Sequence, residues 1–340
     1  MPKKKSKKAP GEKVAAPKET RSLTERMRDE LRKQFGDDAA STLGQGGYSS
    51  VREVMPTGLE VLDHWVIGIG GLPYGRIVEI SGPEDTGKSS LVNHLMRAAQ
   101  KDGAVASLGD SERKVQPNWV DVFQVDKDAV LLLPARTIEE YLGEVMATIK
   151  KFGRRNKVVF FLDSVATAIP KKALDEDLAD SEIPGAMAAA WSRGLRQLNP
   201  LLSESKCMLI LVSQLRSKIG VMFGPTEETA GGRAIKYYSS LRLAVGHGKA
   251  LKEGDLHMGK WASVRAFKNH LGPNHRKASI LLNFQRGWDN DRSLLMYAKE
   301  LGIVDRKCRS VNEARKGLGW NYDEATPDVV IEDVEPKERT

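Results

Sequence analysis

The residues best suited to chemistry form one continuous run, Gly82-Pro83-Glu84-Asp85-Thr86-Gly87-Lys88-Ser89-Ser90. An apolar strand-like run precedes it and a helical pattern follows it, so this glycine-rich run is expected to join a strand to a helix. There Gly82 and Gly87 let backbone N–H groups surround phosphate oxygens at a helix N-terminus. Lys88 would neutralise the β- and γ-phosphates, and the Ser89 hydroxyl would ligate Mg²⁺. The run therefore predicts a site for ATP and Mg²⁺.

Two carboxylates follow apolar runs that are typical of buried strands. Asp163 ends the run Val158–Leu162, and at the carboxyl edge of a parallel sheet it would hold a Mg²⁺-bound water. Glu112 follows the run Ala104–Leu108, which is expected to lie beside the strand before the glycine-rich run. From there it would polarise the water that attacks the γ-phosphate. Asp163 could instead cap a helix, and Glu112 could be a surface residue among basic neighbours.

Between residues 76 and 212 the chain alternates strand-like runs with amphipathic helical patterns. This alternation is typical of a parallel sheet with helices on both faces. Three later runs, joined by short loops, are expected to pair antiparallel, so the sheet is mixed. The predicted strands are Arg76–Ser81, Ala104–Leu108, Val130–Leu133, Val158–Leu162, Met208–Val212, Leu241–Val245, Ala262–Lys268 and Ser279–Phe284. The predicted helices are Ser89–Gln100, Ile138–Lys151, Ala186–Leu202 and, in a small C-terminal unit, Asp291–Gly302.

The two ends of the chain carry opposite charge. Residues 1–36 hold 12 Lys and Arg against 5 Asp and Glu, a net charge of +7, whereas residues 321–340 hold 2 against 7, a net charge of −5. The net charge of the whole chain is +8. This layout suits a protein whose basic segments bind a polyanion and whose acidic tail competes with that polyanion. Each end could equally be a disordered, solubilising tail.

A short amphipathic helix is predicted over Leu23–Phe35. Its apolar residues Leu23, Met27, Leu31 and Phe35 share one face, and a Gly/Ser linker at Gly44–Ser50 follows. The apolar face needs a surface to pack on. A neighbouring subunit and the chain's own core suit the pattern equally well.

The composition bounds the class of protein. With 340 residues, 40% of them hydrophobic, the chain can bury one large core. No apolar run of about 18 residues occurs, and none follows the N-terminal MPKKKSKKAP, so neither a membrane span nor a secretory signal is expected. Cys207 and Cys308 lack the spacing of a metal site and are expected to be reduced thiols in the cytoplasm.

Several longer segments extend these motifs. They are Lys33–Gly36, Gly70–Ile80, the glycine-rich run itself, Ser213–Arg216, Ile219–Gly224 leading to Gly231-Gly232, and Lys236–Ser240. Through these segments the chain resembles the bacterial RecA family of DNA recombinases, over roughly residues 27–287. The region beyond them is shorter and less clearly similar.

The resemblance implies an α/β fold and a division into domains. The expected fold is a RecA-like P-loop NTPase core with a mixed, mostly parallel central sheet, an N-terminal helix and a small C-terminal α/β unit. The expected domains are a basic disordered arm at 1–20, an oligomerisation helix and linker at 21–50, an ATPase core at 51–287, a small C-terminal unit at 288–320 and an acidic tail at 321–340.

The resemblance also implies roles around the ATP site, which in RecA-like proteins lies between subunits. Glu112 falls on the family's catalytic glutamate, and Gln214 falls on its γ-phosphate sensor, whose amide would link the nucleotide to the loop that follows. Trp119 falls on an aromatic residue that stacks on adenine, although it could instead be a core indole. Gln116 stands where the family has an acidic adenine contact.

Two long segments, 175–185 and 216–233, fall on the family's DNA-binding loops. Ile219 matches an apolar side chain that wedges between base triplets, and Gly231 and Gly232 match residues whose N–H groups hold phosphates. Each basic residue among them could instead be a solvated surface residue. The candidate DNA-binding residues are Arg196, Lys218, Ile219, Gly231, Gly232 and Arg233.

The implied function is DNA-dependent ATP hydrolysis by a helical homo-oligomeric filament. It would assemble on single-stranded DNA, gated by ATP, and catalyse pairing and strand exchange with duplex DNA. Single-strand-binding or loader proteins are further candidate partners, and the nucleoid, or the host cytoplasm of a phage, is the expected location. An alternative is a RecA-like paralogue or mediator that binds ATP and DNA without strand exchange. The run Ile219–Gly232 argues against a hexameric motor.

Three departures from the family's pattern keep that alternative open. Ala189 stands where the family usually has a DNA-contacting arginine, and Glu182–Pro184 gives the first loop one extra residue. Lys268 and His270 fall on two lysines that reach the γ-phosphate across the subunit interface, the second being histidine here. Because histidine titrates near pH 6.5, its charge there is expected to depend on pH.

Overall fold

The computed structural model describes residues 22–37, 39–45, 50–134, 136–174, 185–217, 227–229, 232–320 and 327–331. They belong to two compact units, Met1–Ser50 and Val51–Thr340. The predicted basic arm, most of the predicted acidic tail, and Lys218, Ile219 and Gly231 lie outside the described residues.

The N-terminal unit contains one amphipathic helix, α1 (Leu23–Phe35), with the predicted bounds. Ser22 and Glu25 form a capping box at its start, which satisfies backbone N–H groups that a helix end leaves free. The predicted apolar face is exposed within this unit: 65% for Leu23, 58% for Met27 and 67% for Phe35. A short 3₁₀ turn, η1 (Leu43–Gln45), follows.

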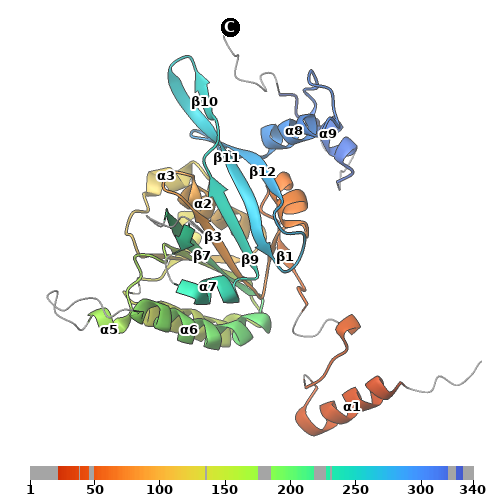
Figure 1. Cartoon of the computed structure of the whole chain (residues 1–340), viewed down its shortest axis with the longest axis vertical. Coiled ribbons are helices and arrows are strands. Elements are labelled where there is room, and N and C mark those ends of the chain that lie inside the picture. Colours follow the sequence, from red (N-terminus) through yellow and green to blue (C-terminus); the bar gives the residue numbers. More distant parts are fainter. Residues whose placement is uncertain are drawn as a thin grey trace, which may run out of the picture. The chain divides into compact units, whose positions relative to one another are not determined.

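A mixed sheet of eleven strands forms the centre of the second unit among the described residues (Figure 1). The strands β9-β3-β7-β6-β4-β5 are parallel neighbours in that order, and β11, β12 and β13 extend the β9 edge antiparallel. β10 pairs with β11 in a projecting hairpin, and β8 pairs with β7. The bounds are β3 (Ile77–Gly82), β4 (Val105–Asp110), β5 (Val130–Leu132), β6 (Val158–Asp163), β7 (Cys207–Ser217), β8 (Glu227–Thr229), β9 (Leu241–Gly246), β10 (Ala250–Glu253), β11 (Leu256–Asn269), β12 (Lys277–Asn283) and β13 (Gly287–Asp289).

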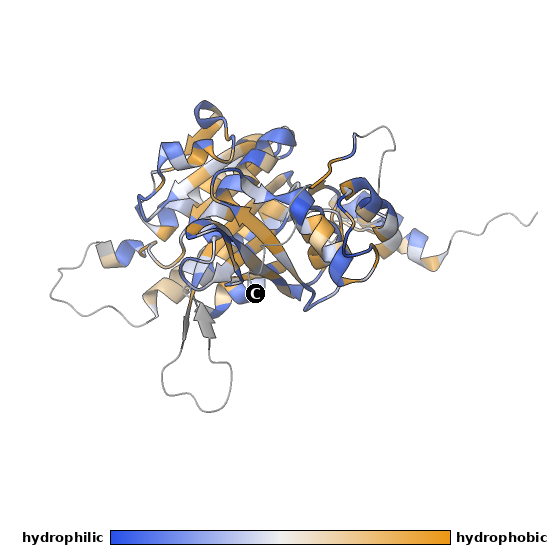
Figure 2. Ribbon diagram, turned by 90° about the horizontal axis from the view of Figure 1, so that it is seen from above, coloured by the Kyte–Doolittle hydropathy of each residue, from blue (hydrophilic) through white to orange (hydrophobic). Residues whose placement is uncertain are grey.

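The inner parallel strands β3, β7 and β6 are buried on both faces because their side chains alternate between two apolar clusters, whereas the edge strand β5 is largely exposed. Val159 and Phe161 of β6 join the cluster that includes α2 (Lys88–Lys101), whereas Phe160 and Leu162 join the one that includes α4 (Ile138–Phe152) and α6 (Ala186–Ser203). Figure 2 shows the result, with hydrophobic strands inside and more hydrophilic helices outside. The predicted α/β fold with a mixed sheet is thereby confirmed.

One predicted neighbour relation is wrong. The strand before Glu112 was expected beside the strand of the glycine-rich run, but β7 and β6 lie between β4 and β3. The connection from β3 through α2 to β4 passes over two strand positions in the sheet, and the later strands β6 and β7 occupy them. Glu112 therefore approaches the site from beside Asp163, because Asp110 and Asp163 are register partners at the ends of β4 and β6.

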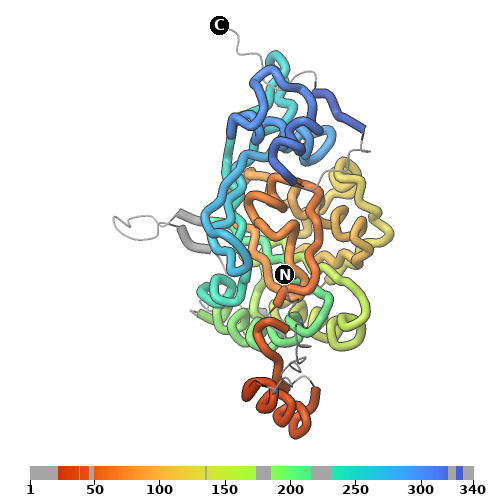
Figure 3. Tube along the Cα trace, turned by 90° about the vertical axis from the view of Figure 1, so that its right-hand side faces the viewer, coloured from red at the N-terminus to blue at the C-terminus, as the bar shows by residue number. Residues whose placement is uncertain are grey.

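Residues 54–73 pack beside the antiparallel part of the sheet. They form a two-stranded sheet, β1 (Val54–Met55) with β2 (Leu72–Pro73), and between these strands the π-helical turn η3 (Val61–Ile67). η3 contacts β11 and β12, more than 180 residues later in the chain, and Figure 3 shows this early segment next to the late ones. None of these three elements was predicted from the sequence.

The remaining helices are short. They are α3 (Pro117–Asp121), the 3₁₀ turn η4 (Lys127–Ala129), α5 (Lys171–Leu174), α7 (Gly232–Tyr238), α8 (Asn290–Glu300) and α9 (Val311–Leu318). Leu295, Ala298, Val304 and Ala314 form a small apolar cluster between α8 and α9, within the same compact unit as the sheet. The domain boundary at residue 287 stays a prediction. No helix in the described part of the chain is long and apolar enough to cross a membrane.

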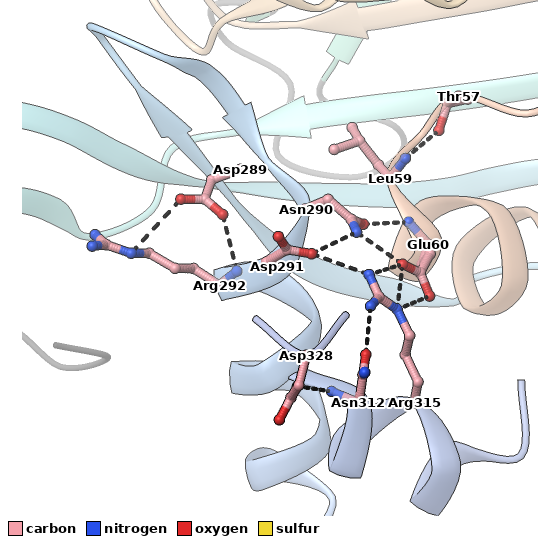
Figure 4. Close-up of polar contacts among 10 residues, drawn as sticks. All are labelled: Thr57, Leu59, Glu60, Asp289, Asn290, Asp291, Arg292, Asn312, Arg315 and Asp328. Atoms are coloured by element: carbon pink, nitrogen blue, oxygen red, sulfur yellow. Dashed lines mark hydrogen bonds and ion pairs between the residues drawn. The ribbon is translucent and has the colours of Figure 1, made fainter. Parts of the chain in front are cut away.

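A polar network joins α9 to η3 and α8 (Figure 4). Arg315 donates hydrogen bonds of 2.7–3.0 Å to both carboxylate oxygens of Glu60 and one of 3.1 Å to Asp291. Asn290 donates to Glu60 and accepts from its backbone N–H. Because the Arg315 side chain is only 14% exposed, this pairing is stronger than an ordinary surface ion pair.

Replacing Arg315 by methionine is expected to lower the free energy of unfolding by about 2 kcal/mol, because Glu60 and Asp291 lose their shared cation. The check is the midpoint of urea unfolding, with Arg306→Met as the matched control, since Arg306 is an exposed arginine of the same region. The control should stay within about 0.5 kcal/mol of wild type. Equal midpoints for both variants would mean that the network contributes nothing to docking α9.

Candidate ATP site

The glycine-rich run forms the turn from β3 to α2, as predicted. Packing, rather than backbone conformation, requires glycine at position 82, because a Cβ there would lie 2.1 Å from the carbonyl oxygen of Val245. Gly87 precedes the first residue of α2 with φ of 101°, a conformation that favours glycine. Any side chain at Gly87 would also meet Trp288, whose ring lies beside the loop. These two glycines let the first N–H groups of α2 face an open loop, the arrangement that binds phosphate.

The Lys88 ammonium group lies inside this loop. It donates a 2.5 Å hydrogen bond to the carbonyl of Pro83, which also accepts from the Thr86 hydroxyl at 3.0 Å. Burial lowers the pKa of Lys88, and the nearby carboxylates of Asp163 and Glu84 act in the opposite direction. A partly desolvated ammonium among acidic groups is a strong point charge for an anionic ligand.

Lys260 was not predicted for this site. From β11 it donates a hydrogen bond to the carbonyl of Asp85, at the tip of the loop, and burial lowers its pKa. Asp85 has a positive φ of 53°, which is uncommon for a residue other than glycine. No local sequence signal marks Lys260, because 175 residues separate it from Asp85.

The predicted metal ligands Ser89 and Asp163 lie together. Ser89 is in the first turn of α2 and Asp163 ends β6; burial raises the pKa of Asp163, while a hydrogen bond from Ser89 favours its charged form. The carboxylates of Glu112 and Asp110 also raise this pKa. Such a buried, crowded carboxylate beside a hydroxyl fits Mg²⁺, which proteins commonly hold with one or two carboxylates, phosphates and waters.

The predicted base Glu112 and the predicted sensor Gln214 are neighbours. The amide nitrogen of Gln214 lies 3.4 Å from a carboxylate oxygen of Glu112, a long and weak hydrogen bond. Lys114 holds the other oxygen at 2.8 Å, and the Glu112 side chain is only 15% exposed. Burial favours the neutral acid, but Lys114 and the charge of Lys88 outweigh it and lower the pKa of Glu112. Glu112 is therefore neither a free surface residue nor a neutral one.

Gln214 also sits beside the glycine-rich run. It is the register partner of Gly82 across the β3–β7 pair, and β7 ends three residues later, at Ser217. The Gln214 side chain thus lies between Glu112, the phosphate loop formed by the glycine-rich run, and the start of the segment predicted to bind DNA.

The predicted adenine contacts lie on α3. Trp119 is 37% exposed and meets Phe123 edge to face at a ring distance of 5.6 Å, so it is not a core indole. Gln116 precedes α3 and is exposed. The ring of Phe123, just after α3, lies so close to Gly287 that a Cβ there would be 3.0 Å from it. The end of α3 is therefore close to the first residue of β13. An exposed indole face of this kind can stack on a base.

Comparisons with known proteins agree with this geometry. The family described as the RecA N-terminal domain matches residues 22–289. The chain is 38% identical over 294 residues to Protein RecA of Ruegeria pomeroyi, covering 85% of this chain and 83% of the relative. It is 34% identical over 296 residues to Protein RecA of Acholeplasma laidlawii, covering 87% of this chain and 88% of the relative. The chain belongs to the RecA family.

In this RecA-family chain, Lys268 is next to the last residue of β11, and His270 follows the strand. Lys268 donates to the carbonyls of Lys236 and Tyr237 at 2.8 and 3.0 Å, at the C-terminus of α7, where a cation is favoured. Burial, and then the charge of Arg242, lower its pKa. His270 is exposed; partial burial and the charge of Lys268 lower its pKa as well. Asn269, between them, pairs with Leu241 of β9, which pairs with Val78 near the start of β3, so both residues lie at the opposite end of β3 from the glycine-rich run.

Three of the predicted DNA contacts are described. Arg196 is exposed on α6, and Arg233 is exposed in the first turn of α7. Gly232 begins α7 with φ of 73°, and a Cβ there would lie 3.0 Å from Ala188 of α6. This close approach, together with the backbone conformation, requires glycine at Gly232.

Proposed function

We propose that this chain is a DNA-dependent ATPase that assembles on single-stranded DNA as an ATP-gated helical filament and catalyses homologous pairing and strand exchange. Membership of the RecA family supports nucleotide hydrolysis, DNA binding and oligomerisation in general. The contact that carries the finer proposal is the one between Gln214 and Glu112, because it connects the hydrolytic carboxylate to the strand that leads into the predicted DNA loop.

Hydrolysis would use the charges already present in the site. Glu112, held ionised by Lys114, accepts a hydrogen bond from the attacking water and orients it toward the γ-phosphate. Lys88 leaves the carbonyl of Pro83 and donates to the β- and γ-phosphate oxygens. Ser89 and Asp163 would hold Mg²⁺, which neutralises phosphate charge when bound. The ring of Trp119 stacks on adenine.

Filament assembly would complete the site. Lys268 and His270 lie level with the start of β3, whereas their own phosphate loop follows its end, and they would reach the γ-phosphate bound by an adjacent subunit. The exposed apolar face of α1 would pack on a neighbouring subunit, since within its own unit no residue of α1 is buried. Single-stranded DNA, duplex DNA and identical subunits are the proposed partners, together with single-strand-binding or loader proteins, in the cytoplasm at the nucleoid or in that of a phage host.

A second candidate function is a RecA-like paralogue or mediator that binds ATP and DNA without strand exchange. It is favoured by Ala189, on α6 beside the first predicted DNA loop, and by His270 in place of a lysine. Formation of a D-loop by the purified protein distinguishes the two candidates, because only the recombinase exchanges strands.

Replacing Gln214 by alanine is expected to abolish the stimulation of ATP hydrolysis by single-stranded DNA while a basal rate remains, because Glu112 and Lys88 stay in place. The measurement is the ATPase rate with and without single-stranded DNA, with Lys88→Ala as the contrasting variant that loses hydrolysis under both conditions. Wild-type hydrolysis that ignores DNA would contradict the recombinase proposal.

Replacing His270 by lysine is expected to flatten the dependence of ATP hydrolysis on pH. The lowered pKa makes His270 neutral near pH 7, so the charge it gives the adjacent site falls as pH rises, whereas lysine stays charged. Between pH 6 and 8 the wild-type rate should fall roughly tenfold more than that of the variant. His257→Lys, at an exposed histidine of β11, is the control. Identical profiles for wild type and His270→Lys would exclude this role.

A further inference from the structure

A cavity of about 250 Å³ lies at the far end of α2 from the phosphate loop. We call it the α2 cavity. His94, Arg97, Ala98 and Lys101 line it, at spacings of three, four and seven residues that put them on one face of α2. The loop Pro56–Gly58 and Asp102 form the rest of the wall.

The α2 cavity is separate from the ATP site. Arg97 lies nine residues after Lys88, a rise of about 14 Å along the helix. Asp102, at the end of α2, contacts Tyr74 at 2.8 Å and Lys157 at 3.0 Å. These two residues stand just before β3 and β6, so the cavity lies at the edge where the parallel strands begin. The phosphate loop and the segments predicted to bind DNA leave the opposite edge.

The α2 cavity carries uncompensated positive charge. Within the described part of the chain, neither Arg97 nor Lys101 forms an ion pair, and the Nε of Arg97 is buried without a hydrogen-bond partner. The two cations lie one helical turn apart, which is unfavourable unless an anion lies between them. Asp102 pairs instead with Lys157, through the same carboxylate oxygen that accepts from Tyr74. A buried guanidinium N–H without a partner is costly, so this one is suited to a ligand.

The wall of the cavity is held in place. The Nε2 atom of His94 is 2.9 Å from the carbonyl of Thr57, and Thr57 donates to the Asp63 carboxylate through its backbone N–H at 2.9 Å and its hydroxyl at 2.8 Å. Burial lowers the pKa of His94 to about 4, so its ring is neutral and Nε2–H donates to Thr57. The loop is therefore fixed against α2, and the site requires little rearrangement to bind.

We propose that the α2 cavity binds a small phosphorylated anion, held by Arg97 and Lys101. A phosphoryl group offers the planar guanidinium two acceptor oxygens and carries enough charge to match both cations, which a single carboxylate does not. The volume is below the roughly 300–1,000 Å³ of pockets for larger ligands, so the occupant is smaller than a typical drug-sized molecule. Pro56 and Ala98 leave room for a short apolar portion beside the phosphate.

The test is equilibrium dialysis of labelled inorganic pyrophosphate against the full-length chain, in EDTA and with Lys88→Ala to suppress binding at the phosphate loop. One saturable site of submillimolar affinity is expected. Arg97→Gln and Lys101→Gln should each weaken it about tenfold or more, because a charged hydrogen bond is lost. Lys150→Gln, at an exposed lysine in the last turn of α4, should change it less than about twofold.

A second variant tests the cavity rather than its charge. Ala98→Leu fills the space without altering any cation and should also prevent binding. The unfolding midpoint of each variant identifies any that fails to fold. If Arg97→Gln does not fold, Arg97→Lys, which keeps the charge, replaces it. Absence of saturable binding up to about 10 mM pyrophosphate, or binding that survives both glutamine substitutions or Ala98→Leu, would overturn the proposal. Because Lys88 is absent throughout, the result does not depend on whether the chain hydrolyses ATP.

Discussion

Replacing Lys88 by alanine is expected to lower kcat/KM for ATP hydrolysis by 10²–10³-fold, with or without DNA, on the order of what loss of one charged transition-state contact costs. Lys88 is 8% exposed and is surrounded by the carboxylates of Asp163, Glu84, Glu112 and Asp85. Without its ammonium group these carboxylates would repel the triphosphate. The loss should therefore appear in nucleotide affinity as well as in rate.

The variant should fold normally, because among the described residues the Lys88 ammonium donates only to the carbonyl of Pro83, which also accepts from Thr86. The measurements are steady-state hydrolysis and the Kd of a fluorescent ATP analogue, with Lys150→Ala on the exposed surface of α4 as the control. A Kd unchanged from wild type would mean that Lys88 stabilises only the transition state. A rate above a tenth of wild type would remove Lys88 from the mechanism.

The elements around the phosphate loop could be predicted closely from sequence because their signals are local. Strand-like apolar runs and a helical pattern predicted β3, α2 and β6 to within one or two residues. Gly82 and Gly87 were expected to permit a tight loop, and Gly87 does so through its backbone conformation. Gly82 has a different cause, the approach of the Val245 carbonyl, which no pattern within the loop encodes.

The strand order and the long-range contacts could not be predicted in the same way. Nothing in the residues 105–110 specifies that β4 pairs with β6, since this choice depends on which later strands occupy the positions beside β3. Lys260 and Lys268 are likewise lysines in ordinary strand patterns, and their contacts with Asp85 and with the end of α7 appear only in three dimensions. The resemblance to RecA identified Lys268, whereas Lys260 required the structure.

Replacing Glu112 by glutamine is expected to lower kcat by 10²–10⁴-fold and to leave the Kd for ATP within about threefold of wild type. Glutamine has the same shape and can still accept from Lys114, but it cannot take a proton from water. The matched control is Glu300→Gln, at an exposed glutamate that ends α8. Single-turnover hydrolysis and nucleotide binding, measured on the same preparations, separate the two quantities.

Lys114 gives this prediction a second, independent test. It donates at 2.8 Å to Glu112 and is among the groups that lower its pKa, so wild-type activity should persist on acidification until pH falls below the usual range of a glutamate. In Lys114→Met the burial of Glu112 acts with less opposition, its pKa rises, and the acid limb of the pH–rate profile should move to higher pH. A base elsewhere in the site would leave that limb unmoved. Full activity of Glu112→Gln, or an acid limb that ignores Lys114, would assign the activation of water to another residue.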